Sequence, residues 1–284
     1  MISAEILQKI KEIEIHTRKA IAGTQVGRRV TKKAGAGFEF DQIRLYQFGD
    51  DIRCIDWKNF AKTGTLYVKQ YLEERNRTCM ICVDISSSLL FSSTKNLKSE
   101  VIQNVASVLA LVAQSGGDKV GLILYADSVE TVIPAGAGRA HVQRILEALF
   151  QVSYVDKKTK SLAVCDYLLQ NLKKTVVCFF VTDGIDDYSD LRFKVLAHKH
   201  EVIMVRCLDA FEHALPSASV WMQDPESKTY FLYTPGSSLN ALLKDRIAEQ
   251  DQQLKKAGIY LLTLQSDSDF IRSIINFFRI QMMY

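Results

Sequence analysis

The sequence contains no long hydrophobic run and no concentration of charge of one sign. Its most apolar segments, such as ASVLALVA and TVVCFFV, fall far short of the roughly 18 residues that a membrane-spanning helix needs. Charged residues near the N-terminus occupy the place of a signal peptide's apolar region. The net charge is +4, and the Lys and Arg residues are scattered among acids. We therefore expect a cytoplasmic protein with no membrane span and no nucleic-acid partner.

Motifs of several common enzyme classes are also missing. There is no G-x-x-x-x-G-K-[ST] phosphate-binding loop, no G-x-S-x-G nucleophile turn and no H-E-x-x-H zinc helix. The 6 cysteines lie mostly inside apolar runs, which is typical of reduced, buried thiols rather than of a disulfide framework. These absences disfavour nucleotide-binding enzymes and ordinary hydrolases, and we expect a protein that is not an enzyme.

From about residue 78 the sequence alternates regularly between apolar strands and amphipathic helices. The strands are expected at 78–84, 119–127, 175–183, 201–209 and 258–266. The helices are expected at 97–115, 139–151, 162–172, 189–200, 238–257 and 268–280. Strands that are apolar on both faces need helices on both sides, joined by right-handed crossovers. The pattern predicts an α/β fold with a doubly wound, mostly parallel sheet and helices on both faces.

The first quarter of the chain has a different character. Residues 2–22 read as a helix with a charged exterior, and residues 23–64 are punctuated by glycine without a long periodic run. An extended segment follows at 65–74. We expect residues 1–76 to form an N-terminal extension that packs on the sheet, and residues 77–284 to form the main domain.

The segment TCMICVDISSSLLFS places one carboxylate and a group of hydroxyls where a buried strand ends. In doubly wound sheets, ligands bind outside the carboxyl ends of the strands. A turn at this point directs alternate side chains to one spot, so Asp84, Ser86 and Ser88 offer a set of oxygen ligands of the kind that Mg²⁺ prefers. The alternative is that the serines only cap the next helix or line a loop.

A second carboxylate, Asp183, stands at the end of another central strand in FFVTDG, where it can reach an ion directly or through water. Together these residues resemble the metal-ion-dependent adhesion site (MIDAS) of von Willebrand factor A (VWA) domains. That pattern is D-x-S-x-S, a threonine on a second loop and an aspartate after the fourth strand. The resemblance implies Mg²⁺ or Mn²⁺ as cofactor, with an acidic side chain of a partner completing its coordination. Thr159 or Ser161 in KKTKSLAVCDYLL can take the threonine's place, although neither is in the family's register.

Residues 35–76 resemble the signature of the bacterial domain-of-unknown-function 58 family: G-x-G-x-E-F, R-x-Y, G-D-D-x-R-x-I-D-W, L-Y-V and E-E-R. The matching positions include Glu39, Arg44, Tyr46, Asp50, Asp51, Arg53, Ile55, Asp56 and Trp57. The resemblance implies a VWA-like fold and a partnership with a MoxR-type AAA+ ATPase. It also implies a role in assembling or activating other protein complexes.

The acidic and basic residues of this signature allow two interpretations. Asp50, Asp51, Arg53 and Asp56 can form a charge-paired turn, with Ile55 and Trp57 anchoring it on the sheet edge. The turn is then either a structural brace or a docking surface for the ATPase. Catalysis is disfavoured, because no nucleophile or histidine accompanies the carboxylates.

The leading hypothesis is a non-enzymatic protein-interaction module. An ion held by Asp84, Ser86, Ser88 and Asp183 would be completed by an acidic residue of a client protein or of the ATPase. One alternative is a metal-dependent hydrolase resembling haloacid dehalogenase phosphatases, which need a second aspartate where this chain has Ser86. The other is a metal-free scaffold whose contacts are made by residues 35–76.

Overall fold

The structure, a computed structural model, describes residues 31–48, 50–73, 77–90, 92–93, 97–154, 158–184, 186–213, 218–223, 229–235, 239–265 and 269–282. The helix expected at 2–22 lies outside the described residues. Internal contacts divide the chain into a smaller unit, Arg28–Asn76, and a larger unit that contains Arg77–Tyr284. Within the described part of the chain, none of the helices combines the length and the apolar character needed to cross a membrane.

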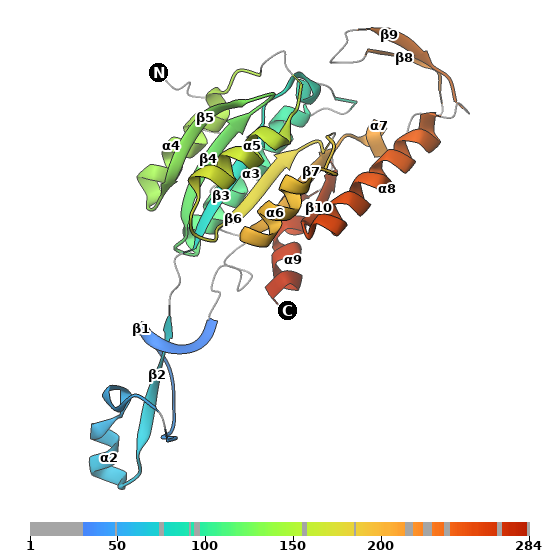
Figure 1. The fold of residues 1–284 in the computed structure, drawn as a ribbon. Helices are drawn as coiled ribbons and strands as arrows, with labels where there is room; N and C mark the ends of the chain where they lie inside the picture. The colour runs from blue at the N-terminus through green and yellow to red at the C-terminus, as the bar shows by residue number, and fades with distance from the viewer. Residues whose placement is uncertain are drawn as a thin grey trace. The chain divides into compact units, whose positions relative to one another are not determined.

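The larger unit is built on a six-stranded sheet with the strand order β10-β7-β6-β3-β4-β5 (Figure 1). Its strands are β3 (Thr78–Asp84), β4 (Lys119–Tyr125), β5 (Val129–Gly136), β6 (Val177–Thr182), β7 (Glu201–Leu208) and β10 (Tyr260–Gln265). All neighbours pair in parallel except β4 and β5. Because consecutive strands diverge on both sides of β3, the sheet is doubly wound, as the sequence predicted.

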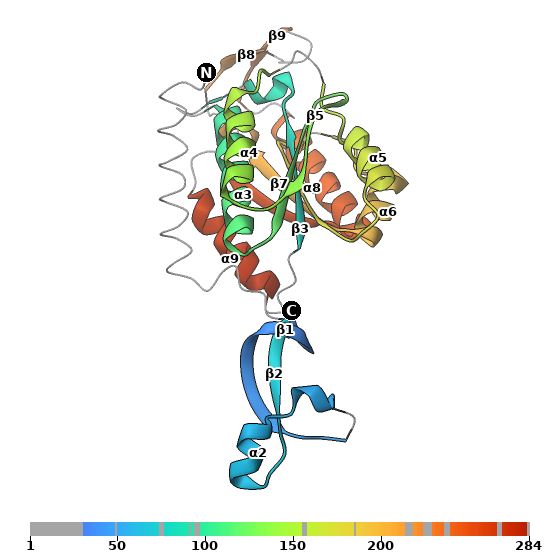
Figure 2. The same cartoon turned by 90° about the vertical axis from the view of Figure 1, so that its left-hand side faces the viewer.

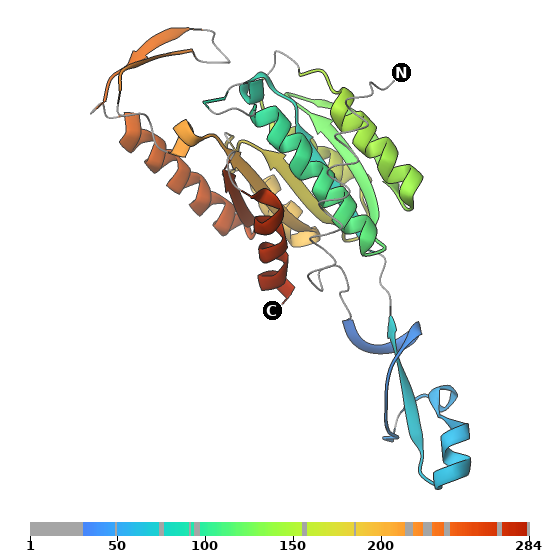
Figure 3. The same ribbon diagram turned by 180° about the vertical axis from the view of Figure 1, so that it is seen from behind.

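Helices cover both faces of this sheet (Figures 2 and 3). One face carries α3 (Lys98–Ser115), α4 (Arg139–Gln151) and α9 (Phe270–Met282), and the other carries α5 (Ser161–Asn171), α6 (Leu191–Lys199) and α8 (Leu239–Ala257). Alternate side chains of β3 enter opposite layers of the core: Ile81 and Val83 pack on the α3 side, and Met80 and Cys82 on the α5 side. The buried strands thus explain why the sequence is apolar without alternation.

The antiparallel strand β5 was not expected from the sequence. It follows β4 through a tight turn in which Ala126 N–H donates to the Ser128 carbonyl at 3.0 Å. Its side chains are mostly exposed or half-buried, and it contains Pro134, which an edge strand tolerates because one of its sides has no partner. The hydrophobic signal of an edge strand is weak, so this strand escaped the periodicity argument.

Two short helical elements of the larger unit lie between the main ones, and a small hairpin precedes α8. The short elements comprise η2 (Ser87–Leu90) after β3 and α7 (Ala210–His213) after β7. The hairpin pairs β8 (Val220–Gln223) with β9 (Tyr230–Tyr233) in antiparallel fashion. Both η2 and α7 begin where a parallel strand ends, so they shape the carboxyl edge of the sheet.

The smaller unit is an antiparallel two-stranded ladder with two short helices. It contains β1 (Thr31–Leu45), η1 (Ile52–Cys54), α2 (Trp57–Thr63) and β2 (Tyr67–Glu73). The carboxylate of Asp56 caps α2 by accepting from Asn59 N–H at 3.2 Å. Gly64 ends α2 at φ 70°, a left-handed conformation that a side chain would strain. The capping residues therefore define a helix too short to give a periodic signal.

Candidate functional site

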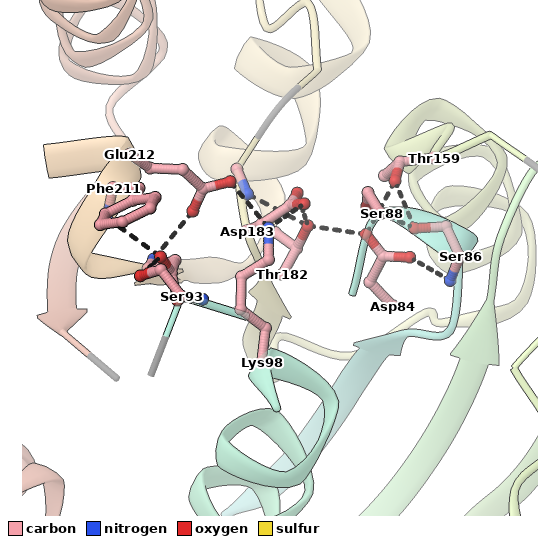
Figure 4. Close-up of polar contacts among 12 residues, drawn as sticks. Asp84, Ser86, Ser88, Ser93, Lys98, Thr159, Thr182, Asp183, Phe211 and Glu212 are labelled. Carbon is pink, nitrogen blue, oxygen red and sulfur yellow. Dashed lines mark hydrogen bonds and ion pairs between the residues drawn. The ribbon is translucent and has the colours of Figure 1, made fainter. Parts of the chain in front are cut away.

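Four side chains converge at the carboxyl edge of the sheet, where β3 ends (Figure 4). We call Asp84, Ser86, Ser88 and Thr159 the hydroxyl cluster. The Asp84 carboxylate turns the chain out of β3 by accepting from Ser86 N–H at 2.9 Å, and Ser86 and Ser88 follow on the resulting turn. Asp84 and Ser86 are completely buried. The D-x-S-x-S spacing thus brings its three side chains together.

Thr159 enters the hydroxyl cluster from a different loop. The next residue, Lys160, donates its N–H to the Ala126 carbonyl at 2.9 Å, which ties the start of α5 to the end of β4. Thr159 Oγ1 donates to Asp84 Oδ2 at 2.9 Å and lies 2.8 Å from Ser86 Oγ. The Ser161 hydroxyl instead lies 3.5 Å from Tyr125 Oη. Of the two candidates for the second loop, the structure therefore places Thr159 beside Asp84.

The oxygen spacing in the hydroxyl cluster is suited to a small hard cation. Ser86 Oγ lies 3.0 Å from Ser88 Oγ and 2.8 Å from Thr159 Oγ1. Neighbouring oxygens around an octahedral Mg²⁺ with bonds of about 2.0–2.1 Å lie about 2.9 Å apart. The residues thus fit such an ion in donor type, and their spacing, which is that of ordinary hydrogen bonds, is compatible with it. The described residues contain no group of three or more His, Cys, Asp or Glu placed to hold a metal, so the fit depends on hydroxyls.

The surroundings of Asp84 shift the pKa of its carboxyl group toward neutral pH. Burial and, to a smaller extent, the nearby Asp183 carboxylate raise its pKa to about 6, against the hydrogen bonds from Ser86 N–H and Thr182. A bound divalent cation would favour the carboxylate form and reverse this shift. Asp84 is therefore a group that a cation would stabilise.

Thr182 connects Asp84 with Asp183 at the end of β6. Its hydroxyl donates to Asp84 Oδ2 at 2.8 Å and lies 3.4 Å from Asp183 Oδ1. Gly184 N–H donates to the same hydroxyl at 3.2 Å. Asp183 thus stands next to the hydroxyl cluster, with Thr182 between the two carboxylates.

On its other side, Asp183 belongs to a second group of charged side chains, which we call the lysine cluster: the buried Lys98, Asp183 and Asp209 and the half-buried Glu212. The ammonium of Lys98 lies 3.3 Å from Asp183 Oδ2 and 2.7 Å from Glu212 Oε1. Burial tends to lower the pKa of Lys98, but the carboxylates of Asp183 and Glu212 outweigh it, so the pKa is raised. Lys98 is therefore charged although it is only 2% exposed.

The lysine cluster also holds α7 and the segment before α3 at the sheet edge. Glu212 Oε2 accepts from Asp209 N–H at 2.8 Å, and Asp209 accepts from Phe211 N–H at 3.0 Å. Ser93 donates to the Asp209 carboxylate both from its N–H, at 2.9 Å, and from its hydroxyl. Figure 4 shows the two clusters side by side, joined at Thr182 and Asp183.

Lys98 and Thr182 were not singled out by the sequence, although each carries a weak signal. Lys98 is the first residue of α3, where its positive charge opposes the helix dipole, so a lysine there needs a compensating partner. Thr182 directly precedes Asp183 at the end of a buried strand. Neither signal indicates which side chain of a distant loop will be the partner.

Comparison with known proteins identifies the family of this chain. Residues 42–252 match the family described as "Protein of unknown function DUF58". The chain belongs to the DUF58 family. It is 25% identical over 280 residues to the uncharacterized protein Rv1480 of Mycobacterium tuberculosis, and the match covers 94% of this chain and 87% of that protein.

Solved structures of remote similarity include BatB from Bacteroides thetaiotaomicron and the SpRpn10 VWA domain. BatB is 15% identical, with a TM-score of 0.47 and coverage of 73% of this chain and 98% of BatB. The SpRpn10 VWA domain is 11% identical, with a TM-score of 0.40 and coverage of 71% and 96%. Since both TM-scores are below 0.5, the fold of this DUF58 chain rests on its own strand order.

The charged residues of the DUF58 signature form ion pairs within the smaller unit. Arg44 binds Asp50 through two hydrogen bonds of 2.8 and 2.6 Å. Arg53 Nε lies 3.3 Å from Asp51 Oδ1. The carboxylate of Asp56 caps α2 and lies 3.5 Å from Lys69 Nζ. Of the four residues expected to pair within the turn, only Asp51 and Arg53 therefore pair with each other, whereas Asp50 and Asp56 pair with Arg44 and Lys69 outside that set.

The apolar and remaining signature residues have different positions in this unit. Ile55 is buried and bridges to Val68, whereas Trp57 is 56% exposed within the unit and contacts Phe60 edge to face. Only Ile55 therefore anchors the turn inside its own unit. The backbone of Glu39 pairs with Leu72, and Tyr46 N–H donates to the Leu66 carbonyl at 3.0 Å. Whether this segment packs on the large sheet stays a prediction.

Proposed function

We propose that this protein is a non-enzymatic protein-interaction module with a Mg²⁺ or Mn²⁺ ion at its hydroxyl cluster. Asp84, Ser86, Ser88 and Thr159 would hold the ion, and Asp183 would stand behind Thr182 in its surroundings. The observation that carries the proposal is the spacing of 2.8–3.0 Å between oxygens that come from two separate loops. When bound, the ion would supply a positive charge with open coordination positions.

The composition of the hydroxyl cluster supports a carboxylate of a partner protein as the completing ligand. Three of its four side chains are neutral hydroxyls, so Asp84 alone would offset the charge of a divalent ion. Such an ion keeps most of its positive charge and attracts a further anionic ligand. An acidic side chain of the partner protein has the required charge and oxygen donors.

The proposed setting of this interaction is the assembly or activation of protein complexes together with a MoxR-type AAA+ ATPase. The support for this partner is the DUF58 signature in residues 35–76 and its resemblance to a family associated with such ATPases. Either the ATPase or a client protein would provide the carboxylate.

Two alternatives make different predictions from the same residues. A phosphatase would require a general acid at position 86, but the Ser86 hydroxyl is engaged with Ser88 and Thr159. Hydrolysis of a generic phosphate ester that is abolished by Asp84→Asn would favour this enzyme. A metal-free scaffold is favoured by the fact that the same hydroxyls satisfy one another by hydrogen bonds, and it predicts partner capture without any divalent cation.

Calorimetric titration of the full chain with Mg²⁺ and Mn²⁺, combined with co-purification of partner proteins, tests the proposal. Asp84→Ala is expected to abolish both ion binding and metal-dependent partner capture. The matched control is Asp245→Ala, which removes an exposed carboxylate from α8. Absence of ion binding by the wild type, with unchanged partner capture by Asp84→Ala, would show that the proposed function is wrong.

A further inference from the structure

A buried ammonium group occupies the side of Asp183 that faces away from the hydroxyl cluster. Lys98 and Asp183 are 2% and 0% exposed, and the Nζ to Oδ2 distance is 3.3 Å. The sequence predicted Asp183 as a direct or water-mediated ligand of an ion. In the structure this carboxylate has a cation from its own chain as a neighbour.

The position of Lys98 is determined by contacts on both sides of it. Its side chain belongs to the first residue of α3, and the ammonium also lies 2.7 Å from Glu212 Oε1. The segment before α3 is held by the two hydrogen bonds from Ser93 to Asp209. Moving the ammonium away would leave the buried carboxylate of Asp183 and the half-buried carboxylate of Glu212 without it, and the burial of Asp183 makes the electrostatic penalty large. Lys98 is thus an integral part of this edge of the sheet.

The charge of Lys98 acts on any cation at the hydroxyl cluster. Asp183 is linked to Asp84 through a single side chain, Thr182. Charges at such short range interact strongly in a buried, poorly screened environment. By neutralising Asp183, the ammonium removes an attraction that would otherwise hold a divalent ion, and it adds a repulsion of its own.

We propose that Lys98 is a specificity-determining residue that weakens divalent-cation binding at the hydroxyl cluster, so that the ion is held firmly only when a partner protein adds a carboxylate. This inference rests on the proposed function for the identity of the site. Without Lys98, the charge of Asp183 would add to that of Asp84, and the ion would be held firmly in the absence of a partner. With Lys98, ion binding and partner binding become coupled, and each strengthens the other by the same factor.

Titration of the full chain with Mg²⁺ alone tests the role of Lys98. Lys98→Met is expected to bind Mg²⁺ at least tenfold more tightly than the wild type. The double variant Lys98→Met/Asp183→Asn should return close to wild-type affinity, because the carboxylate released by the first change is removed by the second. Lys98→Arg, which keeps the positive charge, should bind like the wild type.

Lys98→Gln serves as a second variant if Lys98→Met does not fold, since the amide is neutral and still donates a hydrogen bond to a carboxylate. It is also expected to bind Mg²⁺ more tightly than the wild type. Circular dichroism verifies that each variant is folded. Affinities of folded Lys98→Met and Lys98→Gln that equal the wild-type value, or are weaker, would overturn the inference.

The outcomes separate this inference from the proposed function. Asp84-dependent Mg²⁺ binding that does not change in the neutral Lys98 variants would overturn the inference and leave the proposed function intact. Mg²⁺ binding by Lys98→Met with none by the wild type would support the role of Lys98. The proposed function would then be wrong if the wild type captured its partner equally well with and without Mg²⁺. Absence of Asp84-dependent binding in every variant would overturn both.

Discussion

The two clusters at the carboxyl edge of the sheet balance buried negative charge in different ways. In the hydroxyl cluster, one carboxylate, Asp84, is stabilised by hydrogen bonds from neutral donors. In the lysine cluster, the ammonium of Lys98 lies between the carboxylates of Asp183 and Glu212. The strands that carry Asp84 and Asp183 are hydrogen-bonded neighbours, so the contrast arises within one structural setting.

The difference lies in what compensates each buried carboxylate. Neutral donors leave Asp84 with a pKa raised to about 6, because burial disfavours its charge. The ammonium of Lys98 compensates the negative charges of Asp183 and Glu212. Thr182 separates the two arrangements while hydrogen-bonding to Asp84, so the side chains are close without forming a single ion-pair network.

The largest expected effect comes from removing the ammonium of the lysine cluster. Lys98→Met should lower the free energy of unfolding by about 3–5 kcal/mol without divalent cations, because buried carboxylates lose their ionic partner. Urea denaturation in the presence of a chelator measures this. The control is Arg77→Met, which breaks a half-exposed pair with Glu201 and should cost at most about 1 kcal/mol. Equal losses of stability in Lys98→Met and Arg77→Met would show that the lysine cluster contributes no more than an exposed ion pair.

Removing the carboxylate charge of the hydroxyl cluster should instead increase the stability of the protein. Asp84→Asn should raise the free energy of unfolding by up to about 3 kcal/mol above pH 7 without divalent cations, since it removes an uncompensated buried charge. The carboxyl group has a pKa of about 6 in the folded protein, against an ordinary value of 3.8 for aspartate. The folded state therefore binds the proton more tightly, and wild-type stability falls as the pH rises from about 4 to above 6.

The pH dependence provides the check on this prediction. Urea denaturation of the wild type and of Asp84→Asn should give similar stabilities near pH 4, where Asp84 is protonated in the folded protein, and should diverge up to about pH 7. Adding Mg²⁺ at pH 7 should reduce the gap by stabilising the wild type alone. A difference that is independent of pH would show that the charge of Asp84 is not its cause.

A smaller effect is expected from the hydroxyl that the second loop contributes. Thr159→Val keeps the shape of the side chain but removes its hydrogen bonds to Asp84 and Ser86, which should cost about 1 kcal/mol of stability. It should also weaken Mg²⁺ binding by about tenfold, since one oxygen ligand is lost. The matched control is Thr131→Val at an exposed position of β5, which should change neither quantity.

The smallest effect is expected for the ion pairs of the DUF58 signature. Arg44→Lys replaces the two hydrogen bonds to Asp50 by at most a single point contact. Because this pair is partly exposed to solvent, Arg44→Lys should lower the thermal unfolding temperature by less than Thr159→Val does. A loss comparable to that of Lys98→Met would mean that the pair is buried in the functional protein, as a docking interface would require.

The fold was predictable because its main signal is local. Strands such as β3 and β6 are apolar on both faces, and helices of regular period separate them, so the parallel, doubly wound arrangement follows from burial alone. The edge strand β5 and the short helix α2 were missed. Both are partly exposed, and their residues carry little hydrophobic periodicity.

The sequence could predict the grouping of candidate-site residues only where they lie together on one loop. The grouping of Asp84, Ser86 and Ser88 follows from the turn that ends β3. The choice of Thr159 over Ser161 depends on a hydrogen bond from Lys160 to the end of β4, which no spacing argument contains. The metal role of these residues stays a prediction that the titrations above would test.

The sequence by itself determined the doubly wound sheet, the edge at which polar side chains gather and the DUF58 family, because each depends on patterns within short stretches of chain. Only the tertiary structure decided that Thr159 joins Asp84 and that Lys98 lies against Asp183. The residues of these pairs are 75 and 85 positions apart in the chain. Their contact exists because the sheet brings the ends of separate strands and loops to one edge, where burial makes each unmatched charge costly.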